Sequence, residues 1–206
     1  LRTYRHRIDQ SATAITLTIP SFQALVVYRI SHWLSRFTRR KSLLVFPLIV
    51  VDLLMRRLME IVSNIHISPL ARIGPGLFMP HFGGILIGSG VVIGAHCEIF
   101  HNVTLGRSTP RGTDVPRLGD RVYLGPGAML FGGIEVGDDV YVAANSVLAR
   151  SVPDRACVVG NPSKIVSRNG SFELVDYPGM EADPARQRSR ALRATNVIKA
   201  GIAAEE

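Results

Sequence analysis

The sequence predicts a mainly β protein, a left-handed parallel β-helix of triangular section, with an α-helical region before it and a tail after it. Three observations lead to this prediction: an aliphatic residue that recurs every six residues, a glycine that follows it at seven positions, and an aromatic content of 7%. An α-helix has no period of six, and simple strand alternation needs no glycine at this spacing. A chain that turns a corner every six residues satisfies both patterns.

The aliphatic positions set the register of the coils. They are spaced by six residues, except for one step of 8 and one of 13, and a small or branched residue comes four positions after most of them. Three six-residue sides make one coil, and stacked coils bury a column of aliphatic side chains. The large set is Ile67, Ile73, Met79, Ile87, Ile93, Ile99, Leu105, Leu118, Leu124, Leu130, Val136, Val142 and Leu148, and the smaller set is Ala71, Val91, Cys97, Val103, Val122, Ala128, Ile134, Val140 and Ser146.

The repeat divides the chain into three parts. Apolar residues at helical spacing, with basic residues between them, predict helices in residues 21–64. A chain of 206 residues is long enough to bury a core beside them. The expected parts are an N-terminal helical region over 1–65, the β-helix over 66–166, and a tail over 167–206 with a helix from Pro184 to about Lys199.

Composition narrows the class of protein and its partners. Two cysteines in 206 residues provide neither a disulfide framework nor a metal-binding cluster, so we predict no metal site. The net charge of +8 indicates an anionic partner, either a nucleic acid, a membrane surface or a phosphorylated ligand. A nucleic-acid interface needs a basic stripe with stacking aromatic residues, and the repeat region offers neither, so we predict no nucleic-acid partner.

The most apolar stretch, residues 43–55, is flanked by basic residues on both sides. It is shorter than the roughly 20 residues that a membrane-spanning helix needs, and it contains Pro47 and Asp52. A buried helix with solvated charged ends is the first interpretation, and a helix lying on an anionic membrane surface is the alternative. The first twenty residues contain no apolar secretory core. We therefore expect a cytoplasmic location, with peripheral contact at the inner face of the membrane as the alternative.

His81 is the strongest candidate for a catalytic group. It lies two residues after Met79, where the step in the repeat widens from 6 to 8, and Gly83 and Gly84 follow it. Two extra residues should bulge this corner and move the imidazole into a cleft. Histidine suits the removal of a proton from a hydroxyl because its ordinary pKa lies near neutral pH. We predict that His81 is the catalytic base.

A second histidine lies on the same corner one coil later. His101 comes two residues after Ile99, so its backbone should lie about 5 Å from that of His81 along the coil axis. We predict that His101 orients His81 or hydrogen-bonds the substrate that carries the hydroxyl; a solvated corner histidine is the alternative. His96 is expected on an exposed turn without a function, and Cys97 takes a buried position, where a thiol is a poor nucleophile.

Residues 106–117 interrupt the repeat and must protrude from the prism. Long polar excursions from a regular scaffold are common places for binding groups. Arg107, Arg111 and Arg117 supply positive charge for an anionic substrate or for phosphate groups. We assign Arg107, Arg111 and Asp114 to the site that binds the hydroxyl-bearing substrate; a solvated loop is the alternative.

Four segments of the chain carry a family resemblance. They are Ser21–Leu34 (SFQALVVYRISHWL), Pro80–Gly88 (PHFGGILIG), Ile99–Gly106 (IFHNVTLG) and Val158–Val166 (VVGNPSKIV). Over about residues 20–166 the chain resembles the hexapeptide-repeat acyltransferases, and most of all their serine acetyltransferase branch. The resemblance implies a homotrimer, acetyl-CoA as the donor, and transfer to a hydroxyl or amine in clefts between adjacent prisms.

The donor needs a groove with open backbone groups for its pantetheine arm. Small residues after the histidine corners leave such backbone exposed, and polar residues near the end of the prism lie where phosphate groups would rest. The predicted donor-binding residues are Gly125, Gly127, Ala143, Ala144, Asn161, Ser163 and Lys164.

Three positions depart from the serine acetyltransferase pattern. The acidic residue that usually precedes the turn histidine is Pro80, the aspartate at the junction of helix and prism is His66, and the histidine before a loop proline is Val115. We assign His66 to the acceptor site as a neutral hydrogen-bond partner in place of the missing acid. A junction histidine satisfied by the backbone is the alternative.

These departures decide the acceptor that we expect. Relatives that acetylate sugars share the turn histidine and lack the serine-specific groups, so we expect O-acetylation of a sugar hydroxyl in a surface polysaccharide or its precursor. The acceptor would then be a small molecule or a glycan. Two alternatives stay open, a serine O-acetyltransferase with a divergent pocket and a non-catalytic trimeric scaffold. In the expected step His81 removes the acceptor proton, the oxygen attacks the thioester, and backbone N–H groups stabilise the oxyanion.

Overall fold

The structure, a computed structural model, describes residues 18–37, 46–109, 111–184 and 186–187. Two helices, α3 (Pro20–Phe37) and α4 (Phe46–Ser63), precede a stack of short strands, and a 3-10 helix, η2 (Met180–Ala182), follows it. No helix in the described ranges is long and apolar enough to cross a membrane. The strands are β1 (Ile65–Ile67), β2 (Arg72–Ile73), β3 (Ile85–Ile87), β4 (Val92–Ile93), β5 (Glu98–Ile99), β6 (Thr104–Gly106), β7 (Arg117–Leu118), β8 (Tyr123–Leu124), β9 (Met129–Phe131), β10 (Glu135–Val136), β11 (Tyr141–Val142), β12 (Val147–Leu148), β13 (Cys157–Val159) and β14 (Lys164–Ser167).

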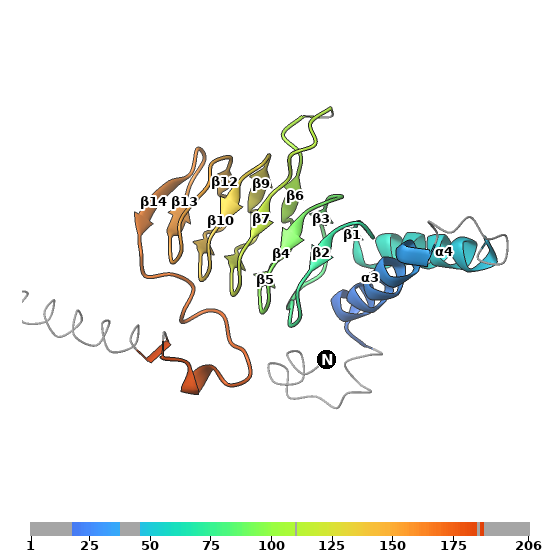
Figure 1. The fold of residues 1–206 in the computed structure, drawn as a ribbon, viewed down its shortest axis with the longest axis horizontal. Coiled ribbons are helices and arrows are strands. Elements are labelled where there is room, and N and C mark those ends of the chain that lie inside the picture. The colour runs from blue at the N-terminus through green and yellow to red at the C-terminus, as the bar shows by residue number, and fades with distance from the viewer. Residues whose placement is uncertain (1–17, 38–45, 110, 185, 188–206) are drawn as a thin grey trace, which may run out of the picture.

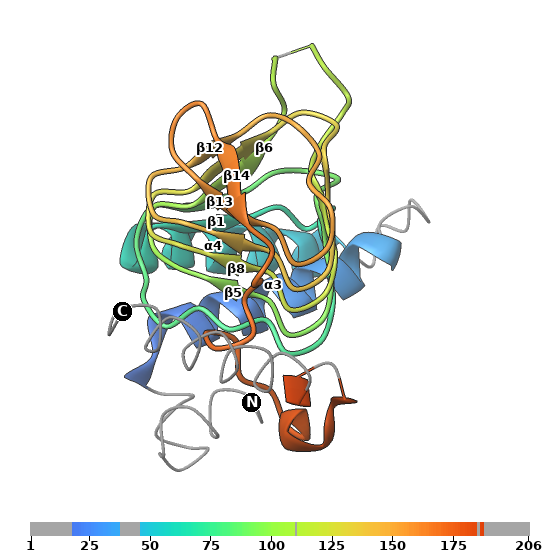
Figure 2. The same cartoon turned by 90° about the vertical axis from the view of Figure 1, so that its left-hand side faces the viewer.

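The strands form three sheets that are the sides of a prism (Figure 1). Sheet A has the order β1–β3–β6–β9–β12, sheet B has β2–β4–β7–β10, and sheet C has β5–β8–β11–β13–β14. Strands of successive coils pair in parallel, and the pairing of β13 with β14 is antiparallel. Figure 2 looks along the stack and shows the coils overlying one another. The predicted left-handed parallel β-helix is confirmed.

The core is the column of aliphatic side chains expected from the repeat. The thirteen large aliphatic positions are all buried, and none exposes more than 8% of its surface. The nine smaller positions are buried as well, with Ile134 the most exposed at 5%. Each coil therefore contributes side chains of both sizes to one continuous core, which is why the six-residue period is strict between the interruptions.

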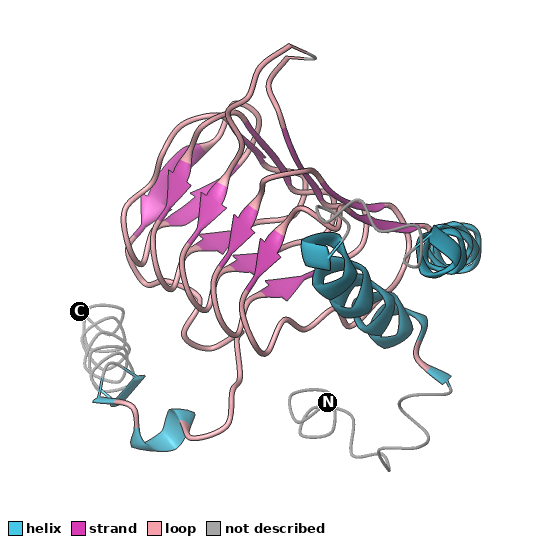
Figure 3. Cartoon of the chain, turned by 45° about the vertical axis from the view of Figure 1, so that its right-hand side comes forward, coloured by secondary structure: helices cyan, strands magenta, loops and turns pink. Residues whose placement is uncertain are grey.

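Helix α3 packs on the first coils of the prism (Figure 3). The Tyr28 hydroxyl donates to the carbonyl oxygen of Ala71 at 2.9 Å, and the Ser21 hydroxyl donates to that of Met79 at 2.7 Å. The Arg29 guanidinium donates to the carbonyl oxygens of Ile73 and Gly74 at 2.6 Å each. These side chains occupy backbone acceptors at the open end of the prism, so the helix closes that end.

Helix α4 differs from the first interpretation of the apolar stretch. It packs against α3, where Asp52 accepts from Ser31 and from the guanidinium of Arg56, but most of its apolar residues lie outside this contact. Phe46 is 64% exposed and Ile61 is 81% exposed. The expectation of a buried helix is therefore wrong for the single chain, because α3 covers one narrow side of α4.

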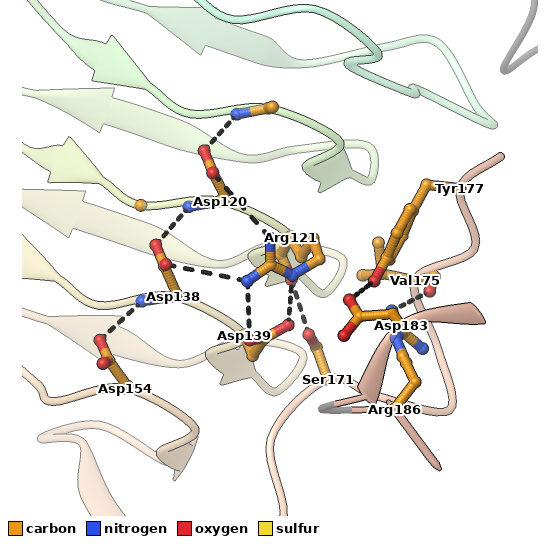
Figure 4. A network of polar contacts seen from close by, with 12 residues as sticks. Asp120, Arg121, Asp138, Asp139, Asp154, Ser171, Val175, Tyr177, Asp183 and Arg186 are labelled. Atoms are coloured by element: carbon orange, nitrogen blue, oxygen red, sulfur yellow. Dashed lines mark hydrogen bonds and ion pairs between the residues drawn. The ribbon is translucent and has the colours of Figure 1, made fainter. Parts of the chain in front are cut away.

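The segment that follows β14, residues 168–183, folds back along the prism. No pattern in the sequence indicated this arrangement. The Ser171 hydroxyl donates to the carbonyl oxygen of Arg121 at 2.6 Å, and the Arg121 guanidinium binds both carboxylate oxygens of Asp139, at 2.7 and 3.0 Å (Figure 4). The Tyr177 ring stacks on His96 at 5.2 Å between centroids. His96 is thus half-buried under this segment, so the expectation that it lies exposed on its turn is wrong.

The helix expected over the last residues lies largely outside the described ranges. Pro184, Arg186 and Gln187 are helical, and the remainder of the predicted helix, up to about Lys199, falls on residues that the structure does not describe. Within the described part, Arg186 is buried between the rings of Phe172 and Tyr177. This contact ties the start of that helix to the segment that folds back.

Candidate active site

The predicted catalytic and donor-binding groups lie along one edge of the prism, where sheet C turns into sheet A; we call it the histidine edge. Its corners are residues 79–84, 100–103, 125–128 and 143–146 in successive coils. The turn 160–163, which joins β13 to β14 within sheet C, extends this edge, because its backbone is hydrogen-bonded to that of Val147 in β12. The two predicted catalytic histidines lie on its first two corners. The predicted donor residues lie on its later corners and, for Lys164, at the start of the next strand. One edge therefore carries both sets of residues, although the sets come from separate parts of the sequence.

The first corner has the shape that the widened step predicts. Gly83 and Gly84 adopt the left-handed backbone region, with φ of 104° and 66°, which a residue with a side chain rarely adopts. The space beside Gly83 is open, and its carbonyl oxygen accepts from the backbone N–H of Asn102 in the next coil at 2.9 Å. The two glycines thus let the longer corner bulge while it stays bonded to its neighbour, and His81 is exposed on it.

His81 and His101 are neighbours on consecutive coils, as the repeat predicts. Their ring centroids are 5.9 Å apart in an edge-to-face arrangement with an interplanar angle of 74°. His81 also contacts the ring of Phe100 at 5.8 Å, and His101 is half-buried. Two imidazoles and one apolar ring therefore converge on the open corner, a combination suited to handling a proton beside an apolar wall.

The later corners of the histidine edge hold the predicted donor residues. Ala144, Asn161 and Lys164 are exposed, and Ala143 and Ser163 are half-buried. Two glycines have a further reason to be there: a methyl group at Gly125 would lie 2.7 Å from the backbone nitrogen of Ala144, and the space beside Gly127 (φ 72°) is filled by Asn145. These glycines let the coils stack closely, so their small size does not by itself indicate a ligand.

His66 is engaged by a side chain that sequence reasoning missed. Its Nδ1 lies 2.6 Å from Oε1 of Glu60, a residue in the last turn of α4. Because an ionised carboxylate can accept but not donate, Nδ1 is the donor. The alternative that backbone groups satisfy this histidine is therefore wrong. No sequence period pairs positions six residues apart across the end of a helix, so the sequence carried no signal for this contact.

The predicted acceptor residues of the loop stand at the other edge of sheet A. The loop between β6 and β7 protrudes, as expected, and Arg107, Arg111 and Asp114 are exposed on it (Figure 1). Arg107 lines an open hollow of about 520 Å³ together with Leu86, Gly88, Ser89, Gly106, Ser108 and Thr109. The width of one prism side separates this loop from the histidine edge of the same chain, about 20 Å for six extended residues.

Two other expectations concern metals and thiols. Among the described residues, no group of three or more His, Cys, Asp or Glu side chains could hold a metal ion. Cys97 is fully buried, and burial raises the pKa of its thiol to about 12. A thiol that stays protonated is a poor nucleophile, so an acetyl-cysteine route through this residue is disfavoured.

The chain is similar to curated proteins over most of its length, although no protein-family model matches it. It is 35% identical over 174 residues to a serine acetyltransferase of Synechococcus elongatus, covering 84% of this chain and 68% of the relative. It is 36% identical over 156 residues to that of Helicobacter pylori, covering 75% and 86%. For the enzyme of Escherichia coli K12 the identity is 33% over 184 residues, and the chain spans 62% of that relative's length.

Solved structures give the same result. A soybean serine acetyltransferase complexed with serine matches with a TM-score of 0.70 and 34% identity, covering 80% of this chain and 65% of that one. A serine acetyltransferase in complex with CoA matches with a TM-score of 0.67 and 31% identity, covering 80% and 66%.

The prism, its glycine-widened histidine corner and these matches define a hexapeptide-repeat acetyltransferase, a class of acetyl-CoA-dependent acyltransferases. Within that class, the chain belongs to the serine acetyltransferase family.

This finding corrects the expected acceptor. The expectation of a sugar hydroxyl, and of a closest likeness to sugar O-acetyltransferases, is wrong, because the relatives are serine acetyltransferases at 33–36% identity. The expectation depended on three missing side chains, at Pro80, His66 and Val115. The loss of a group that binds one acceptor does not create a site for another, whereas the likeness extends over 174 residues.

Proposed function

We propose that the chain transfers the acetyl group of acetyl-CoA to the hydroxyl of L-serine, with His81 as the general base. The observation that carries the proposal is the His81–His101 pair on a glycine-widened corner in a member of the serine acetyltransferase family. The products are O-acetyl-L-serine and CoA.

The proposed step is a direct transfer between the two substrates. His81 removes the proton of the serine hydroxyl as its oxygen forms a bond to the thioester carbonyl carbon. The tetrahedral intermediate carries a negative oxygen, which backbone N–H groups at the corner stabilise. The carbon–sulfur bond then breaks, and the imidazolium returns its proton to the leaving thiolate. His101, 5.9 Å away between ring centroids, orients His81 or hydrogen-bonds the acceptor.

The donor is proposed to lie along the histidine edge beyond the two imidazoles. A solved relative in complex with CoA supports the choice of donor. The backbone at Ala143 and Ala144 would receive the pantetheine arm beside Gly125 and Gly127, and the ammonium of Lys164 would meet phosphate groups near Asn161 and Ser163. This order places the thioester toward the catalytic corner and the charged end of CoA toward the end of the prism.

The proposed assembly is a homotrimer in which adjacent prisms form the clefts. The position of Arg107 and Arg111 at the edge of sheet A opposite His81 supports it, because a neighbouring copy could bring such a loop to the histidine edge. In this arrangement a guanidinium would bind the serine carboxylate in a bidentate manner. The cytoplasmic location and membrane contact expected for the helical region stay predictions.

The test is acetyl-CoA turnover followed by the thiol released. We expect the wild-type chain to acetylate L-serine in preference to free sugars, nucleotide sugars and polysaccharide repeat units. The His81→Ala variant should lose about 10²–10⁴-fold in kcat, because proton transfer by a positioned side chain contributes that much. The matched control is His96→Gln, on the edge between sheets B and C, which should keep kcat within about threefold.

Three outcomes would overturn the proposal. Folded wild-type protein that consumes acetyl-CoA with sugars but not with L-serine would reject the acceptor. An unchanged kcat in His81→Ala would reject the base. Turnover with none of these acceptors would favour the non-catalytic scaffold.

A further inference from the structure

Helix α4 leaves a wide apolar face exposed in the part of the chain that the structure describes. The side that meets α3 carries Asp52, which accepts from Ser31 and Arg56. Another side carries apolar residues at intervals of three and four, which places them in one stripe along the helix. The exposed residues of this α4 stripe are Val51, Leu54, Met55, Leu58, Ile61 and Val62. Leu54 is 62% exposed and Ile61 is 81% exposed, and apolar surfaces of this kind mark contacts with a protein or a membrane.

The α4 stripe continues into a groove between α3 and α4. The groove has a volume of about 260 Å³, and Asp52 is the only charged residue in its lining. Ile30 and Trp33 line it from α3, and Val51 and Met55, which also belong to the stripe, line it from α4. Stripe and groove therefore form one continuous apolar surface, which we call the helical face. Figure 1 shows both helices at the β1 end of the prism, away from β14.

The charge of the helical region is strongly positive. Residues 20–63 contain seven basic and two acidic residues, which gives a net charge of +5, and three of the basic residues follow one another at 39–41. Both acidic residues, Asp52 and Glu60, accept from arginine side chains of α4. The side chain of Arg57, which lies on the turn between Leu54 and Ile61, is 69% exposed. The excess of positive charge therefore favours an anionic partner beside the apolar face.

The chemistry of the helical face fits a lipid bilayer better than a protein surface. Protein interfaces carry about one hydrogen bond per 100–200 Å², whereas the side chains of the α4 stripe offer no strong donor or acceptor. The hydrocarbon boundary of a bilayer needs none. A second copy of the chain would bring two regions of net charge +5 together, and like charges oppose that contact. An anionic bilayer attracts the same charge, by about fivefold in affinity for each basic residue near its surface.

We propose that the helical face docks on an anionic lipid bilayer, with α4 lying in the plane of the interface and its stripe inserted below the headgroups. Helices that bind in this way bury their apolar face about 5–10 Å into the boundary between headgroups and acyl chains. Trp33 suits the level of the headgroups, where tryptophan is enriched. The long side chain of Arg57 can extend its guanidinium to lipid phosphates while its stem lies along the apolar surface. This inference is independent of the acetyl transfer and of its acceptor.

Trp33 gives a direct signal for the test, because it is the only tryptophan in the chain. We expect its emission to shift to shorter wavelength with vesicles of phosphatidylcholine and phosphatidylglycerol, and not with vesicles of phosphatidylcholine alone. Lipids brominated in the acyl chain should quench it. Raising the ionic strength from about 0.1 M to about 1 M shortens the Debye length from about 10 Å to about 3 Å, so it should weaken binding by about tenfold or more.

Cosedimentation with the same vesicles measures the apolar contribution. Leu54→Ser with Ile61→Ser should lower the affinity by about 100-fold, because each aliphatic side chain that leaves water contributes about tenfold. Both residues are exposed, so the thermal unfolding of this double variant should match that of the wild-type chain. The matched control is Ile165→Ser with Val166→Ser, which changes two exposed apolar residues of β14 at the other end of the prism and should leave binding unchanged.

Four outcomes would overturn the inference. One is equal vesicle binding by the two double variants, and another is wild-type binding that phosphatidylglycerol does not strengthen. Emission of Trp33 that stays unshifted in vesicle-bound protein would show that a different surface binds. A particle mass in solution that Leu54→Ser with Ile61→Ser reduces to half, without vesicle binding by the wild-type chain, would assign the helical face to a second copy instead.

Discussion

At the scale of single residues, Cys97 shows most clearly how the prism changes side-chain chemistry. The side chain is fully buried, and its thiol donates to the carbonyl oxygen of Gly119 at 3.3 Å. Burial raises the pKa of the thiol to about 12, whereas in the unfolded chain it is about 8.5. The folded state thus holds a proton that the unfolded state releases as the pH rises.

The sign of the resulting pH dependence follows from this proton. The contribution of the Cys97 thiol to the stability of the folded state is fully present below the pKa of this thiol in the unfolded chain. It is lost as the pH rises from about 9 toward the pKa of the thiol in the folded chain. We predict that above pH 9 the free energy of unfolding falls faster in the wild-type chain than in Cys97→Val, by up to about 1.4 kcal/mol per pH unit. Urea unfolding between pH 7.5 and 10.5 measures the difference in slope, and parallel curves for the two proteins would contradict the prediction.

At the scale of elements, the close approach of successive corners explains the glycine of the repeat. A methyl group at Gly94 would lie 2.3 Å from the carbonyl oxygen of Gly119 and 2.4 Å from Oδ1 of Asp120. Gly106 occupies the equivalent position before the protruding loop, where nothing lies within 4 Å of such a group. The glycine of the repeat is therefore required by close packing at Gly94, whereas no such packing requires it at Gly106.

This contrast gives a matched pair of variants. Gly94→Ala should lower the free energy of unfolding by about 1–3 kcal/mol, because the backbone of the next coil cannot move away without breaking its pairing. Gly106→Ala should change it by less than about 0.5 kcal/mol. Chemical denaturation of the two variants is the measurement, and equal losses of stability would contradict the explanation by close stacking of the coils.

The elements also show where sequence reasoning stopped. The inward positions, the bulged corner at His81 and its pairing with His101 could be predicted, because a period of six fixes which residues share a corner. The exposed face of α4 could not be predicted, because the sequence of an apolar helix is the same whether or not a partner covers that face. Residues such as Ser171 and Tyr177 follow no period, and Glu60 meets His66 through a turn whose direction no pattern encodes.

At the scale of the whole molecule, the candidate site is divided between the two edges of sheet A. His81 and His101 lie at one edge, and Arg107 lies on the loop at the other. One side of the prism, about 20 Å, separates them within a chain. In a cyclic trimer, the loop edge of one copy can face the histidine edge of the next, so each site would take its base from one chain and its guanidinium from another.

Mixed trimers test this division directly. Chains carrying His81→Ala and chains carrying Arg107→Ala, each weakly active alone, should form wild-type sites when coexpressed with different tags and purified through both. Every cyclic trimer that contains both kinds of chain has an intact His81 beside an intact Arg107 at about one interface in three, so about a third of the wild-type activity should return. The control pair is His81→Ala with His101→Ala, which should give no recovery, because the two imidazoles lie side by side on the histidine edge of the same chain. Recovery in both pairs, or in neither, would contradict a site shared between copies.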